Sequence, residues 1–342
     1  MVHKIAGLLV QIGHNVTVLN GFFPGAKRAE VIDGVQYKRV GFGRFGPRID
    51  QAVYLMLLPL QVVFRKYNVW IENSMSPISV SFLQIFTWKP IILRTSFFDA
   101  KEMTLKYGIP FHYLENMSIK TYKNFIASSE VFGDKIAKVN KKANIHLIPN
   151  GIDDKYFNVI RQEQKFILFL SRVDFEQKGM DMLLTIAAGT LLKNNIRLVI
   201  AGSGSAVEVR RLQDEIKSSP VANKIEYIGK VENEAKIKLL SEAMVLVSTS
   251  RHETFSNSVL EAMASGVPTI GFDIDGLSWA SGHEMVKVTK YNIKIFQSEL
   301  EKLLNDNNLR NTYSKNAKDF ATKYKWENLT RLYENLLSSL GI

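Results

Sequence analysis

Residues whose types suit the binding of an anion lie in the second half of this 342-residue chain. Arg172 and Lys178 follow an apolar run that ends at Leu170. If that run is a strand of a parallel sheet, both cations lie near its carboxyl end, where open α/β sheets bind ligands. Arginine offers phosphate a planar fork and lysine a mobile point charge, so the pair suits a diphosphate. Taken alone, two such cations are more often solvated surface residues.

A short glycine motif follows a second apolar run. Gly202 and Gly204 would let backbone amides approach an anion closely. The dinucleotide fingerprint requires a third glycine where this chain has Val207, so a nicotinamide site is disfavoured. An ordinary tight turn explains the two glycines equally well.

Two glutamates lie around the start of a predicted helix. Glu253 precedes the N-cap candidates Ser256, Asn257 and Ser258, and Glu261 follows them within the opening turns. Free amides at the helix start would hold a phosphate, which leaves the carboxylates for the hydroxyls of a sugar and a ribose. Two glutamates at this spacing also occur often by chance.

A parallel sheet would position these residues. Along the whole chain, apolar runs of strand length alternate with stretches whose apolar residues have helical spacing. The fold class is therefore α/β. In the second half we expect strands at 165–170, 196–201, 224–228, 243–248 and 268–271. In the first half we expect one doubly wound sheet with strands at 15–19, 69–72, 90–95, 124–128 and 145–148, and helices at 51–66 and 111–122.

The turn signal Pro149-Asn150-Gly151 and the polar stretch that follows it mark a boundary between two domains. The last segment, from Trp326 to Leu340, has the spacing of an amphipathic helix and is free to pack elsewhere.

Composition excludes several classes of protein. The chain is 46% hydrophobic and 23% charged, which is typical of a folded globular protein. It has no cysteine, so disulfides and thiolate sites are excluded. No apolar run reaches the roughly 18 residues of a membrane-spanning helix, since the longest is interrupted by Pro59 and Gln61.

The formal net charge of +11 is concentrated in the first half, where residues 1–150 hold 19 Lys and Arg against 9 Asp and Glu. An anionic membrane surface or a phosphorylated acceptor would suit this charge, and no nucleic-acid motif is present. The expected helix 51–66 is rich in apolar residues and ends in Arg65-Lys66, as an interfacial helix would. A core helix of the first sheet is the more ordinary interpretation. Further basic residues fall in expected loops: Lys27, Arg28, Lys38, Arg39, Arg44 and Arg48.

The order of these motifs resembles glycosyltransferase family 4, the retaining GT-B nucleotide-sugar transferases of group 1 type. The resemblance rests on Arg172 with Lys178, the Gly202-x-Gly204 turn, the Glu253-x7-Glu261 pair and the following Ala-Met-Ala-Ser-Gly-Val-Pro. It covers nearly the whole chain. It implies two doubly wound, Rossmann-like domains facing across a cleft: an acceptor-side domain of residues 1–149 joined by the helix 326–342, and a nucleotide-sugar domain of residues 150–325.

The same resemblance implies the roles of the site residues. Arg172 and Lys178 would neutralise the donor diphosphate, and Glu253 would contact the transferring sugar. Gly202 and Gly204 would admit the diphosphate to the backbone, and Glu261 would bind the ribose. The remaining donor-binding residues would be Thr254, Phe255, Ser256 and Asn257.

The predicted activity is retaining transfer of a hexose from a nucleotide sugar to a glycan or lipid-linked acceptor, without a metal or other cofactor. A cytoplasmic protein, peripheral on the membrane, is expected. Two alternatives share the architecture: a catalytically inactive partner subunit and a sugar-nucleotide epimerase.

Three features depart from the family pattern. The chain begins inside the helix that normally follows the first strand and its glycine loop, so we expect a shortened reading frame. A histidine common in relatives is absent after the strand 90–95, and Asp99 becomes the acceptor-side candidate, although a helix cap or surface carboxylate is the commoner role. Asp273 and Asp275 form an Asp-x-Asp sequence, but its position past the helix disfavours a metal site.

Overall fold

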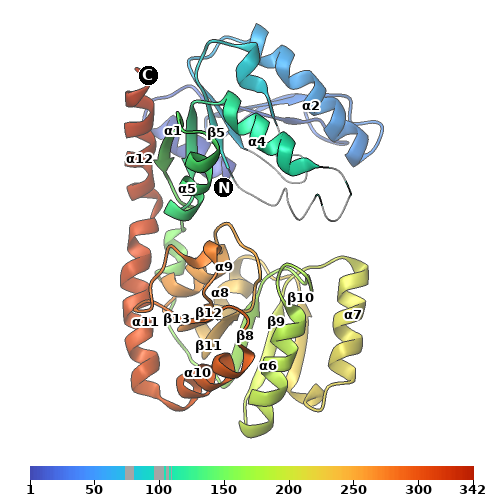
Figure 1. Cartoon of the computed structure of the whole chain (residues 1–342), viewed down its shortest axis with the longest axis vertical. Coiled ribbons are helices and arrows are strands. Elements are labelled where there is room, and N and C mark those ends of the chain that lie inside the picture. Colours follow the sequence, from blue (N-terminus) through green and yellow to red (C-terminus); the bar gives the residue numbers. More distant parts are fainter. Residues whose placement is uncertain (74–80, 96–103, 105–107, 109) are drawn as a thin grey trace. The chain divides into compact units, whose positions relative to one another are not determined.

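The computed structural model describes the chain except for residues 74–80, 96–103, 105–107 and 109 (Figure 1). The chain divides into two compact units, Met1–Ile148 with Glu327–Ile342, and Pro149–Trp326. The predicted boundaries are at 149/150 and 325/326. Each unit contains parallel sheet and flanking helices, so the predicted α/β class with two Rossmann-like domains is confirmed.

The second unit is built on a six-stranded parallel sheet with strand order β10-β9-β8-β11-β12-β13. The five predicted strands are confirmed to within two residues, whereas β13 is three residues long and was not predicted. All residues of the neighbouring strands β8 and β11 are buried, because helices cover both faces of such a sheet. The strands are β8 Phe166–Leu170, β9 Arg197–Ala201, β10 Ile225–Gly229, β11 Val245–Ser248, β12 Thr269–Phe272 and β13 Val286–Val288. The helices are α6 Met180–Lys193, α7 Ala206–Lys217, α8 Asn233–Glu242, α9 Asn257–Ala264, α10 Ile293–Asn305 and α11 Asn307–Ala321.

The strands of the first unit form two hydrogen-bonded sheets, so the prediction of one sheet is wrong for the described residues. One sheet has the order β1-β3-β2 and the other β4-β5-β6-β7. The reason is that no strand among the described residues pairs with the outer edge of β1 or of β4. The strands are β1 Thr17–Gly21, β2 Ala29–Ile32, β3 Val35–Val40, β4 Trp70–Asn73, β5 Ile91–Arg94, β6 Asn124–Ala127 and β7 Asn144–Leu147.

Strands β2 and β3 form an antiparallel hairpin that was not predicted. Its turn is Asp33-Gly34, and both residues have positive φ, at 50° and 79°. An Asp-Gly pair between apolar residues is a strong sequence signal for a two-residue hairpin turn. The information was therefore present in the sequence.

Helix α2, Pro47–Phe64, packs one face on the core of the first unit. Leu58 and Val62 are buried in a cluster with Leu83 of the short 3-10 helix η1, Leu83–Phe86. Tyr54 on the same helix donates a hydrogen bond to the carbonyl of Leu19 in β1 at 3.1 Å. The other helices of this unit include α1 Val2–Gln11, α4 Phe111–Thr121, α5 Glu130–Val139 and α12 Trp326–Ser339. In the described part of the chain, no helix combines the length and the apolar character needed to cross a membrane.

The chain passes between the units twice, near residue 149 and near residue 326. The two passages are bonded to each other within the second unit. The backbone N–H of Ile152 donates to the carbonyl of Tyr324 at 2.9 Å, and the Trp326 indole donates to Asp153 at 3.1 Å. A Cβ on Gly151 would lie 2.4 Å from the Trp326 ring, so glycine is required beside this indole.

Candidate functional site

Lys178 and Glu253 form an ion pair between the turn before α6 and the loop before α9. Each side chain is only 11% exposed. The hydroxyl of Ser250 donates a second hydrogen bond to the same carboxylate oxygen at 3.0 Å. Two residues that are 75 positions apart in the sequence are thus brought into direct contact.

Backbone geometry positions Lys178. Gly179 has φ +66°, and a Cβ there would lie 2.2 Å from the carbonyl oxygen of Thr249. The Thr249 hydroxyl in turn donates to the carbonyl of Lys178 at 3.0 Å. The turn before α6 therefore packs directly on the end of β11, which carries the loop to Glu253.

A second ion pair, between Arg251 and Asp181, joins the start of α6 to the loop after β11. Arg251 contacts both carboxylate oxygens of Asp181, with the NH1 bond at 2.9 Å, and also donates to the carbonyl of Phe175 at 2.7 Å. Burial alone would raise the pKa of Asp181, but the hydrogen bonds and charge of Arg251 outweigh it and lower that pKa. Bidentate pairs of this kind fix geometry as well as charge. Neither residue was predicted, because nothing in their spacing singles them out.

The Gly202-x-Gly204 turn lies against the segment that carries Arg172. The backbone N–H of Ser171 donates to the carbonyl of Ala201 at 3.0 Å, and Val173 forms a parallel β-bridge with Gly204. A Cβ on Gly202 would lie 1.7 Å from the carbonyl oxygen of Ser171. Close backbone approach therefore explains why this position is glycine.

Arg172 is the solvent-accessible cation of the site. Its side chain is 55% exposed and donates to Asp174 at 3.1 Å. Gln177 links this region to the Glu253 loop, since it accepts a hydrogen bond from Arg172 and its amide contacts the carbonyl of His252 at 3.4 Å. Arg172 thus lies on the same edge of the sheet as Lys178 and remains accessible to a ligand.

Glu261 is held by two residues that were not predicted. The Nζ of Lys236 on α8 lies 2.9 and 3.0 Å from its two carboxylate oxygens. The hydroxyl of Tyr156 donates to one of them at 2.9 Å. Burial, and then the negative charge of Glu261, raise the pKa of the Tyr156 phenol. Because the three residues come from distant segments, no local motif in the sequence could have revealed this cluster.

The segment between Glu253 and Glu261 contains both buried and exposed side chains. The ring of Phe255 is buried and stacks on Trp279 with centroids 4.7 Å apart, so this side chain is part of the core. Ser256, one of the three predicted candidates, is the N-cap residue of α9; it is buried and its side chain makes no capping hydrogen bond. Asn257 is exposed and accepts a hydrogen bond from Asn150 at 2.9 Å. Thr254 lies in the loop between Glu253 and this buried ring.

The two aspartates of the Asp-x-Asp sequence form ion pairs with different lysines. Asp273 pairs with Lys287 at 3.1 Å and Asp275 with Lys290 at 3.5 Å. Within the described ranges, no cluster of three His, Asp or Glu side chains could hold a metal ion. A metal-independent reaction remains a prediction. Asp99, the acceptor-side candidate, lies outside the described residues.

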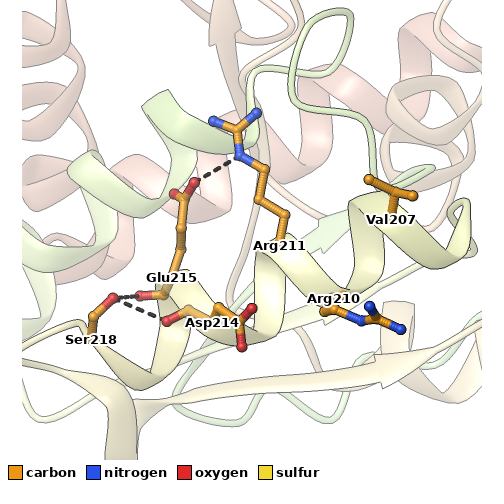
Figure 2. Close-up of a pocket in the computed structure, with 6 residues that line it drawn as sticks. All are labelled: Val207, Arg210, Arg211, Asp214, Glu215 and Ser218. Atoms are coloured by element: carbon orange, nitrogen blue, oxygen red, sulfur yellow. Dashed lines mark hydrogen bonds and ion pairs between the residues drawn. The ribbon is translucent and has the colours of Figure 1, made fainter.

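Figure 2 shows a surface pocket along α7. It is lined by Val207, Arg210, Arg211, Asp214, Glu215 and Ser218. Arg211 is engaged there, since its Nε donates to Glu215 at 2.9 Å and its guanidinium lies 3.8 Å from the Phe175 ring centroid. The pocket lining is thus mostly charged surface of one helix, whereas the candidate residues lie at the carboxyl ends of strands.

The site therefore combines two partly buried, ion-paired carboxylates with an accessible arginine and a glycine turn. Cations and closely packed backbone at the carboxyl ends of parallel strands can hold a diphosphate. Carboxylates beside them can accept hydrogen bonds from sugar hydroxyls.

Comparison with known proteins gives a consistent result. A family model described as glycosyl transferases group 1 matches residues 152–320. An uncharacterized glycosyltransferase of Methanocaldococcus jannaschii is 28% identical over 240 residues, which are 64% of this chain and 61% of that protein. The GDP-mannose:cellobiosyl-diphosphopolyprenol alpha-mannosyltransferase of Xanthomonas campestris is 28% identical over 190 residues, 54% of this chain and 50% of that protein. The alignments thus span about half to three fifths of these relatives.

Solved structures share the fold over nearly the whole chain. The sucrose-phosphate synthase of Thermosynechococcus elongatus superposes with a TM-score of 0.79 at 18% identity, and covers 99% of this chain and 93% of that one. The HepE protein of Anabaena in complex with UDP and glucose has a TM-score of 0.71 at 14% identity, covering 90% and 87%.

Proposed function

Because residues 152–320 belong to the group 1 glycosyl transferases, we propose that the chain transfers a sugar from a nucleoside diphosphate sugar to a glycan or lipid-linked acceptor, with retention of the anomeric configuration. The observation that carries the proposal is the buried Lys178–Glu253 pair beside the glycine turn and Arg172. A nucleotide-sugar donor is also supported by the relative named for GDP-mannose and by the neighbour that holds UDP and glucose.

In this proposal the Lys178–Glu253 pair is the resting arrangement of the donor site. A diphosphate offers Lys178 a doubly charged partner and so competes with the carboxylate of Glu253. Glu253 then accepts hydrogen bonds from hydroxyls of the donor sugar, while Ser250 continues to orient it. Arg172 closes on the diphosphate from solvent.

Charge development explains why the cations matter for the reaction. As the glycosidic bond breaks, negative charge grows on the departing diphosphate. Cations already positioned there stabilise the transition state more than the ground state, and this difference accelerates the reaction. Glu261 contributes to binding through the ribose, with Lys236 and Tyr156 holding its carboxylate in place.

The test is a screen of nucleotide sugars by thermal shift, followed by donor hydrolysis with the stabilising compound. A donor present at 100 times its Kd should add about 2.7 kcal/mol to the free energy of unfolding. Hydrolysis of that donor would support a transferase. Binding without turnover under any acceptor condition would instead favour an inactive subunit, and epimerised donor would favour an epimerase.

A further inference from the structure

Exposed large apolar side chains are concentrated in the first unit. Of the 26 that the described residues contain, 20 belong to this unit and six to the second. Scattered exposed apolar residues are normal for a soluble surface, but a contiguous set marks an interaction site.

Helix α2 carries a continuous apolar stripe on the face opposite the core. Its exposed members, 49% to 79% exposed, recur at helical spacing over four turns: Ile49, Met56, Leu60, Val63 and Phe64. The buried Leu58 and Val62 lie on the other face. Residues three, four and seven apart share one side of a helix, so the stripe is a true second apolar face. It is about 22 Å long at 1.5 Å per residue.

Exposed apolar side chains also occur on the 3-10 helix η1, which packs against α2. The two elements pack together, and Tyr67 after α2 donates a hydrogen bond to Thr87 after η1 at 3.4 Å. Ile85 and Phe86 are 64% and 46% exposed, and Trp88 is fully exposed. We call α2's exposed stripe together with Ile85, Phe86 and Trp88 the apolar face.

The charge around the apolar face is positive. Arg44 precedes α2 and Lys66 follows it, and both are exposed. Lys89 adjoins Trp88 and lies 4.5 Å from the Tyr67 ring centroid. The one acidic residue of α2, Asp50, is buried and accepts a hydrogen bond from the backbone of Arg44.

The surrounding sequence is also nearly free of acidic residues. Between positions 51 and 98 the only acidic residue is Glu72, which accepts a hydrogen bond from Tyr122 at 2.7 Å. Burial raises the pKa of Glu72, which favours its neutral form.

From this arrangement we infer that the apolar face of α2 and η1 inserts into the interface of an anionic bilayer. An amphipathic helix lying flat, with an exposed tryptophan and lysines at its margin, matches the two contributions to interfacial binding: apolar burial and attraction to anionic lipid. The positive rim selects a bilayer over an ordinary protein partner. This inference goes beyond the proposed function, since it concerns where the enzyme works and not which bond it makes.

The experiment follows Trp88 and vesicle binding together, with vesicles of phosphatidylcholine alone or with about one third phosphatidylglycerol. We expect sedimentation with the anionic vesicles only, a blue shift of the Trp88 emission, and its quenching by brominated lipid. Trp88→Phe should remove most of the shift, which separates this signal from the other three tryptophans.

A double variant, Met56→Ser with Phe64→Ser, should reduce the partition coefficient at least tenfold. Val207→Ser is the matched control, because Val207 is 76% exposed on α7 of the second unit and should leave partitioning unchanged. Nucleotide binding, measured on the same preparations, should be equal in the wild type, the double variant and the Val207→Ser control. A failed donor test is thereby distinguishable from a failed membrane test.

Three results would overturn the inference: equal binding to both vesicle types, no binding to either by a folded chain, or no quenching of Trp88. A stable dimer that the double variant abolishes would assign the apolar face to a second copy instead.

Discussion

At the residue scale, the buried Lys178–Glu253 pair couples ligand binding to stability. Removing one member leaves the other charge buried without its partner, which costs about 3–5 kcal/mol in comparable pairs. We therefore expect Lys178→Ala and Glu253→Ala to lower the melting temperature as well as turnover. If the two residues were solvated surface residues, the same substitutions would leave the melting temperature nearly unchanged.

A double-mutant cycle with Lys178→Met and Glu253→Gln separates the two effects. The double variant should recover most of the stability that each single variant loses, because no unpaired charge remains. Turnover should stay at least tenfold below wild type in all three variants. Recovery of turnover together with stability would show that the pair is structural only. Thermal melts and donor hydrolysis on each protein are the measurements.

Arg172 provides the contrasting case. Its side chain is half exposed, so Arg172→Ala should leave the melting temperature nearly unchanged. Loss of charged hydrogen bonds to a diphosphate should nevertheless weaken donor binding about tenfold or more, at roughly 1.5–3 kcal/mol. Calorimetric titration with the nucleoside diphosphate measures this. If the Arg172→Ala variant binds the nucleoside diphosphate with wild-type affinity, Arg172 is not part of the donor site.

Glu261 and Lys236 allow a test of positioning. Lys236→Met should impair nucleotide affinity in the same direction as Glu261→Gln, because a carboxylate without its cation loses its fixed orientation. Lys236→Arg should restore part of the affinity. Neither variant should change turnover at saturating donor, whereas Glu253→Gln should. If Lys236→Met binds nucleotide normally, Lys236 serves only to neutralise a buried carboxylate.

At the element scale, the strands of the second unit could be predicted because they are short apolar runs bounded by turn residues. The motifs at Arg172, Gly202 and Glu253 could be placed because parallel strands bring their carboxyl ends to one edge. The partners of Glu261 could not, since Tyr156 and Lys236 meet it only through tertiary packing. The split of the first unit into two sheets could not be predicted either, because apolar strand patterns do not specify which edges pair.

Tyr54 on helix α2 leads us to expect that the protein becomes less stable at alkaline pH. Burial, and next the charge of Glu72, raise the pKa of Tyr54 from 10.0 to about 12. A phenol whose pKa is higher in the folded state stabilises that state fully below the unfolded pKa. The contribution is lost as pH rises through the folded pKa. The free energy of unfolding should therefore fall between pH 10 and about pH 12, measured by circular dichroism in urea.

The control is Tyr54→Phe, which cannot ionise. It should be less stable at neutral pH, because the hydrogen bond to Leu19 is lost, yet its stability should fall less steeply in the same pH range. Parallel pH profiles for the two proteins would contradict a role for Tyr54.

At the scale of the whole molecule, the second unit is an insertion between two parts of the first. Helix α12 contributes Leu329, Tyr333, Leu336 and Leu337 as buried residues of the first unit. A protein truncated after residue 148 should therefore expose the surface that these side chains cover and fail to fold cooperatively. Residues 149–326 alone should fold. Denaturant melts of the two fragments, with the intact chain as reference, check this.

The double passage of the chain also sets an order of events during synthesis. In the order of synthesis the second unit is completed at residue 326, whereas the first unit must wait for the sixteen residues from Glu327 to Ile342. Strands β1 to β7 are thus made first and finished last. Throughout that interval they are the part of the nascent chain most in need of a chaperone.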